Sequence, residues 1–68
     1  MGLTEALEQA QERALAQLPD GWSVWWVYSS GARVTWCARP AGVPRSVAEA
    51  PTTDALVKRA KEWTANHG

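Results

Sequence analysis

The sequence contains only one cysteine, Cys37, and one histidine, His67, among its 68 residues. A single cysteine excludes an internal disulfide and a Cys-rich zinc site, and with them the class of small secreted domains held together by disulfides. Two distant potential ligands also fall short of the four that a structural zinc ion needs. We therefore expect this chain to bind no metal and no cofactor.

A long hydrophobic run is also missing. The longest strongly apolar segment, residues 24–28, is far shorter than the roughly 20 residues of a membrane-spanning helix. The first 20 residues carry four acidic side chains and one arginine, the opposite of the basic start of a secretory signal peptide. These features predict a soluble, cytoplasmic protein without membrane contact.

Groups that could perform catalysis are sparse. A nucleophile needs a nearby base, yet His67 lies beside the last residue and Cys37 lies within a predicted strand with no second motif near it. The five glycines are scattered along the chain and form no phosphate-binding loop. We expect that the chain is not an enzyme by itself and has no catalytic residues.

Tryptophan is the residue that the sequence has in abundance, with five copies and no phenylalanine. A chain this short buries only roughly 60% of its unfolded surface, so a single domain over residues 1–68 must build its core from a few large side chains. We expect Trp22, Trp26, Trp36 and Trp63 to provide much of that core.

Two segments have the periodicity of amphipathic helices. Residues 3–18 place Leu or Ala at steps of three and four, with Thr4 as the expected N-cap and residues 19–21 as the stop signal. A second helix is expected after Pro51, with Thr52 or Thr53 as its cap. Its apolar face is formed by Leu56, Ala60 and Trp63.

Residues 22–28 and 33–39 are rich in Trp, Val and Thr and predict the two strands of a hairpin. A three-residue loop that ends at Gly31, in the left-handed conformation, would place Trp26 opposite Val34 and all even-numbered residues on one apolar face. The other pairs in this register are Tyr28 with Ala32, Val24 with Trp36, and Trp22 with Ala38. A two-residue loop would instead mix arginines with tryptophans on one face, so the pattern favours the longer loop.

Residues 45–49 predict a short third strand at the edge of the sheet. The resulting order of helix, strand, strand, strand and helix predicts an α+β two-layer sandwich, in which both helices cover the even-numbered face of an antiparallel meander. If the third strand did not form, two copies of the chain could pair along residues 33–39.

The uncovered, odd-numbered face of the hairpin is where we expect a partner to bind. The net charge is zero, but residues 21–48 carry three arginines and no acidic side chain. Trp and Arg are the residue types that dominate the energetics of protein interfaces. The predicted binding residues are Trp25, Val27, Arg33, Thr35 and Arg39.

The same residues allow two other interpretations. A tryptophan beside arginines can stack on a base and bind a phosphate, which would make the face a nucleic-acid site. Trp25 can instead lie over Val27 and the arginine stems, and stabilise the hairpin without any partner. Because three arginines make a small phosphate footprint, we expect a protein partner or a homodimer before nucleic acid.

Short motifs over about residues 21–60 resemble those of small proteins of unknown function from GC-rich actinobacteria of the Streptomyces type and from their phages. These motifs are Gly21-Trp22, Val24-Trp25, Trp36-Cys37-Ala38-Arg39-Pro40 and Asp54-Ala55-Leu56. Residues with GC-rich codons, namely Ala, Arg, Gly and Pro, far outnumber Phe, Ile, Lys, Asn and Tyr, in agreement with such a source. The resemblance implies an actinobacterial protein that stands alone, and it implies no activity.

The predicted order of elements is similar to that of the double-stranded-RNA-binding domain. That family reads RNA with a Gly-Pro-x-His-like loop between its first two strands and with a lysine-rich start of its last helix. This chain has Ser29-Ser30-Gly31 in the loop and Thr52-Thr53-Asp54 at the start of the helix. We therefore transfer no RNA-binding residue from that family.

Overall fold

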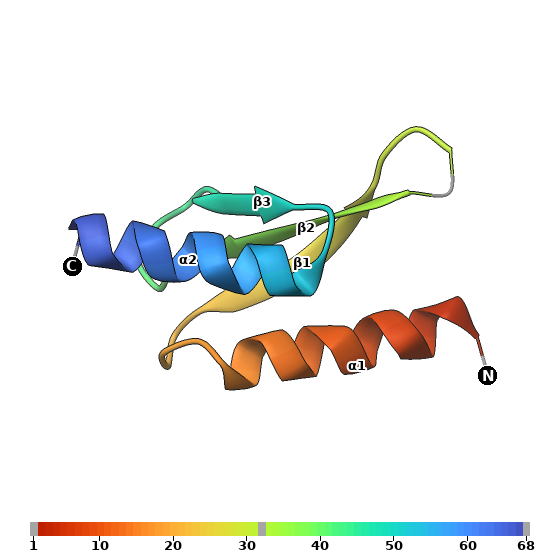
Figure 1. Ribbon diagram of the computed structural model, residues 1–68, viewed down its shortest axis with the longest axis horizontal. Coiled ribbons are helices and arrows are strands. Elements are labelled where there is room, and N and C mark those ends of the chain that lie inside the picture. Colours follow the sequence, from red (N-terminus) through yellow and green to blue (C-terminus); the bar gives the residue numbers. More distant parts are fainter. Residues whose placement is uncertain (1, 32, 68) are drawn as a thin grey trace.

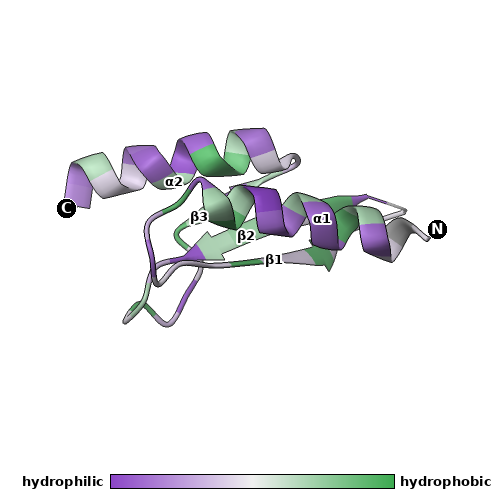
Figure 2. Cartoon of the chain, turned by 90° about the horizontal axis from the view of Figure 1, so that it is seen from below, coloured by the Kyte–Doolittle hydropathy of each residue, from purple (hydrophilic) through white to green (hydrophobic). Residues whose placement is uncertain are grey.

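The computed structural model describes residues 2–31 and 33–67. Three strands form an antiparallel sheet in the order β1-β2-β3, and both helices lie on one side of it (Figures 1 and 2). This is the α+β two-layer sandwich that the sequence predicts. In chain order the elements are α1 (Leu3–Ala16), β1 (Ser23–Tyr28), β2 (Val34–Arg39), β3 (Ala48–Ala50) and α2 (Thr53–His67).

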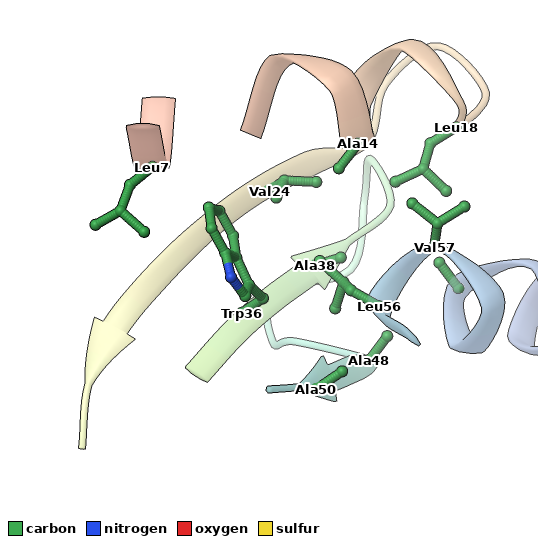
Figure 3. Packing of buried hydrophobic residues seen from close by; sticks show 11 residues of the cluster. Leu7, Ala14, Leu18, Val24, Trp36, Ala38, Ala48, Ala50, Leu56 and Val57 are labelled. Atoms are coloured by element: carbon green, nitrogen blue, oxygen red, sulfur yellow. The ribbon is translucent and has the colours of Figure 1, made fainter. Parts of the chain in front are cut away.

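The core lies between the middle strand and the two helices. Figure 3 shows Trp36 and Ala38 of β2 in one cluster with Ala14 of α1 and Leu56 of α2. Alanine at the points of closest packing lets each helix backbone approach the sheet, because a methyl group takes little space. The predicted core role of Trp36 is confirmed, and Trp22 and Trp26 pack against the same cluster while remaining partly exposed.

α1 begins one residue before the predicted cap. Gly2 is the N-cap and makes no side-chain cap hydrogen bond, so the prediction that Thr4 caps this helix is wrong. Leu3 is already helical, which places Thr4 inside the first turn, where its hydroxyl is not at the capping position. The helix ends at Ala16, and Leu18 follows it in a tight turn that still buries the leucine side chain.

α2 is capped as predicted. The Ala55 N–H donates to Thr52 Oγ1 at 3.2 Å, which satisfies one of the unpaired amides of the first turn. Trp63, however, lies outside the buried cluster, so the prediction that it belongs to the core is wrong, because it lines the solvent-open hollow between α2 and β3. It is half-buried and contacts the ring of Trp22 edge-on at 6.0 Å, while His67 stacks on it at 4.5 Å.

The hairpin has the predicted faces but a different register. Trp26 lies opposite Trp36, and Tyr28 lies opposite Val34, a slip of two residues from the predicted pairing. The Ser29 N–H donates to the Arg33 carbonyl at 2.9 Å, so the connection comprises residues 30–32. The predicted pair of Tyr28 with Ala32 involves a residue outside the described part of the chain.

The observed register brings two indole rings together. Trp26 and Trp36 contact each other edge-on, with ring centroids 5.5 Å apart, an arrangement that stabilises a cross-strand pair. Gly31 has the expected left-handed conformation, with φ of 75°, within the shifted connection. Because the slip is an even number of residues, it leaves every side chain on its predicted side of the sheet.

The third strand forms, but later than predicted, at Ala48–Ala50 instead of residues 45–49. Ala48 and Ala50 are buried toward the helices, and Glu49 between them faces the other side. Small apolar side chains at both inward positions fit below α2, which explains why the strand begins at Ala48. Because β3 covers this side of β2, two copies cannot pair along residues 33–39.

The buried face of α2 yields the first prediction. Leu56 is fully buried in the cluster, so the substitution Leu56→Ala should lower the free energy of unfolding by about 3 kcal/mol. The matched control Lys61→Ala, on the exposed side of the same helix, should change it by less than about 0.5 kcal/mol. Urea unfolding followed by circular dichroism measures both, and equal effects would contradict this packing.

Candidate binding surface on the open sheet face

The side of the sheet that faces away from the helices, called here the open face, is the candidate functional surface (Figure 2). Cross-strand partners in an antiparallel sheet share a face, so the register defines its members. Trp25 lies opposite Cys37, and Val27 lies opposite Thr35. On the other side of β2, Cys37 lies opposite Glu49.

Three of the predicted binding residues come together on this face. Trp25 and Thr35 are half-buried, and Val27 is 46% exposed. Strand pairing brings them together because β1 and β2 run side by side over six residues each. The hairpin therefore provides an apolar surface with the Thr35 hydroxyl group beside it.

The two predicted arginines lie at opposite ends of the open face. Arg33 precedes β2 and is exposed beside the hairpin connection, whereas Arg39 is the last residue of that strand. Six residues of extended chain separate them by roughly 20 Å. The two guanidinium groups therefore cannot bind one phosphate together.

Arg39 is also engaged within the chain. Its Nη1 donates to the Val43 carbonyl at 2.9 Å, in a partly buried hydrogen bond. This contact ties the connection between β2 and β3 to the end of β2. The sequence did not reveal it, because a side-chain bond to a loop carbonyl follows no periodic pattern.

Glu49 is a member of the open face that was not among the predicted binding residues. It is exposed and accepts a hydrogen bond from the Ser46 hydroxyl at 3.0 Å. The alternation in Ala48-Glu49-Ala50 is the signal that could have placed it, since two inward alanines require an outward residue between them. Its carboxylate puts a negative charge on a face for which only arginines were predicted.

Cys37 is buried although it belongs to the open face. It is a small residue on the middle strand, with the larger Trp25 and Glu49 on its two sides. Burial raises the pKa of the Cys37 thiol, and the nearby Glu49 carboxylate raises it further. A thiol held in its neutral form is a poor nucleophile and a poor metal ligand.

Tyr28 extends the apolar surface around the edge of β1. It is 62% exposed, and together with Val27 it makes up the exposed large hydrophobic residues of the described chain. The sequence predicts Tyr28 on the helix side, which is its face, but the hairpin extends past the start of α2 and diverges from α1 (Figure 1). Its ring therefore remains uncovered.

One helix side chain reaches each edge of the sheet. Gln11 Nε2 of α1 donates to the Val24 carbonyl on β1. Arg59 Nη1 of α2 donates to the Glu49 carbonyl on β3 at 2.6 Å. These bonds satisfy carbonyl groups that point out of the sheet edges, where no neighbouring strand is present.

A shallow hollow of about 550 Å³ lies between α2 and β3. Its polar lining mixes both signs of charge, with Arg59 beside Glu49 and Glu62. Arg59 already donates to a main-chain carbonyl there, so no set of like groups converges on a ligand. The open face thus has the better-defined chemistry.

Within residues 2–31 and 33–67, no three potential ligands gather into a metal-binding group, and neither helix has the length and apolar character to span a membrane. No protein-family model matches the sequence, and no match was found among curated proteins or solved structures. The resemblances to actinobacterial proteins and to the double-stranded-RNA-binding domain therefore stay predictions.

The environment of Cys37 predicts how stability depends on pH. The pKa of the Cys37 thiol is raised in the folded chain above its ordinary value of about 9.0, so the unfolded chain loses the thiol proton first and alkali favours unfolding. Above that pH the free energy of unfolding should fall, by at most about 1.4 kcal/mol per pH unit from this group. In the Cys37→Ala variant this fall in the free energy of unfolding should be absent. Urea unfolding at several alkaline pH values measures it for both proteins. If the free energy of unfolding fell equally with pH in both proteins, the pH dependence would not come from Cys37.

Proposed function

We propose that this chain is a small, non-enzymatic protein-interaction module of the cytoplasm, which binds its partner through the open face at the hairpin end of β1. The observation that carries the proposal is the exposure of Val27 beside the half-buried Trp25 on the open face, together with the exposure of Tyr28 at the adjoining edge of β1. Adjacent exposed apolar side chains on a small protein are typical of a contact surface. An aromatic anchor beside them is typical of the residues that dominate binding energy.

Nucleic acid is a less suitable partner for this face. Arg39 donates to a loop carbonyl, and Arg33 lies roughly 20 Å away along the strand. Glu49 adds a negative charge that would repel phosphates. A phosphate backbone needs several free cations along one path, and the described open face does not supply such a path.

A purely structural role for Trp25 explains less of the surface. If Trp25 only packed over the hairpin, this would explain why its indole is partly buried. It would not account for Val27, which remains in water beside Trp25 on the open face, or for Tyr28, which remains in water on the helix side at the edge of β1. A partner that covers all three side chains accounts for the whole arrangement.

Photo-crosslinking tests the proposal. A benzophenone amino acid at position 27 should give a discrete protein adduct in cells, because position 27 is at the centre of the proposed contact. The same amino acid at position 61, on the exposed side of α2, should not give that adduct. The additional substitution Trp25→Ala should reduce the yield at position 27 about tenfold, the loss expected for removal of an aromatic anchor.

Two results would contradict the proposal. One is equal adducts from positions 27 and 61. The other is a change in tryptophan fluorescence on addition of mixed single-stranded and duplex oligonucleotides that disappears at high salt and in Trp25→Phe. That second result would assign the face to nucleic acid, since only phosphate contacts depend steeply on salt.

A further inference from the structure

The outer edge of β1 has unpaired main-chain groups. Bonded and non-bonded pairs alternate along an antiparallel ladder, and Ser29 is bonded to Arg33. The N–H and C=O groups of Val24, Trp26 and Tyr28 therefore point away from β2. The bond from Gln11 to the Val24 carbonyl agrees with this direction, since it comes from α1 and not from a strand.

α1 covers only the beginning of this edge. Gln11 occupies the Val24 carbonyl, and beyond that point the strand and the helix diverge toward the hairpin (Figure 1). Trp26 and Tyr28 together present two N–H donors and two C=O acceptors to the outside. Main-chain groups spaced in this way match another extended strand.

The two edges of the sheet differ in how they are protected. β3 is only three residues long and has a glutamate at its centre, and Arg59 donates to the outward-pointing carbonyl of that glutamate. All three features oppose the addition of a strand. β1 has six residues and contains no charge, proline or glycine. Natural proteins usually place charged residues or proline on an edge strand that must stay unpaired, and β1 has neither.

We infer that β1 pairs antiparallel with β1 of a second copy of this chain, about a two-fold axis that passes beside Val27. The two three-stranded sheets then become one continuous sheet. This inference rests on the proposed function, because it names the partner that covers the same apolar surface.

The occupied carbonyl of Val24 determines the register. A two-fold axis at Trp26 would require the Val24 carbonyl as an acceptor, and Gln11 already donates to it. An axis at Val27 instead places Trp26 opposite Tyr28 of the second copy, and Tyr28 opposite its Trp26. Each of these two pairs forms two main-chain hydrogen bonds, and none of them uses Val24.

The side chains are compatible with this pairing. The two Val27 residues become a non-bonded pair, the type in which side chains approach most closely. Tyr28 lies beside the partner's Trp26 on the other side of the sheet, so both exposed hydrophobic residues are covered. The strand carries no charged side chain and the chain has no net charge, so no charge on β1 itself opposes the second copy.

Charge substitutions at Val27 test both the partner and the register. The wild-type mass in light scattering should rise with concentration toward twice 7.4 kDa. Val27→Lys and Val27→Glu should each raise the dissociation constant at least roughly tenfold, because two like charges would face each other about 5 Å apart. An equimolar mixture of the two variants should regain the dimeric mass. Val27→Thr, an uncharged β-branched control, should remain dimeric.

Proline at position 28 tests the main-chain contribution. Tyr28→Pro removes an amide that points outward and has no partner in the sheet, so the monomer should keep its circular dichroism spectrum but lose the dimeric mass. Tyr28→Ala removes the same ring and keeps the amide, so it should retain more dimer than the proline variant. Equal loss in both variants would exclude strand pairing.

The outcomes separate this inference from the proposed function. A wild-type mass that stays at 7.4 kDa at all concentrations overturns the dimer. If position 27 still gives a crosslink to a different protein, the interaction module is retained with another partner. If the crosslink is absent as well, both proposals fail. A dimer that persists in Val27→Lys would overturn the pairing along β1.

Discussion

Trp36 holds the two layers together from the centre of the middle strand. It is almost fully buried, and the indole of Trp26 on the neighbouring strand contacts it edge-on at 5.5 Å. A short chain has few large side chains with which to exclude water, so the position of this one determines where α1, α2 and β1 can pack. The alanines of the core then allow both helix backbones to come close to the strand that carries Trp36.

The architecture could be predicted because it depends on periodic patterns. Steps of three and four identify the helices, and alternation identifies which side of each strand is buried. Register and element ends depend on contacts between distant residues. The two-residue slip of the hairpin gains a contact between Trp26 and Trp36, and the late start of β3 follows from inward alanines below α2. Neither contact is visible in a local pattern.

The candidate surface was predictable to the same degree. Alternation correctly placed Trp25, Val27 and Thr35 on one face, because a slip of two residues preserves the side of each residue. The sequence could not show that Arg39 donates to the carbonyl of Val43. It could not show that Tyr28 lies beyond the cover of the helices either, since exposure depends on how far each element extends in space.

The unequal protection of the two sheet edges determines how many further chains the sheet can add. A protein with two open edges can add copies without end and grow into a fibril. With Arg59 on the Glu49 carbonyl of β3, only the β1 edge is free to accept a strand, and a two-fold contact uses that edge in both copies at once. Growth of the proposed dimer would therefore stop at two chains, because the short length of β3, its central glutamate and the Arg59 hydrogen bond together keep the far edge of the sheet closed.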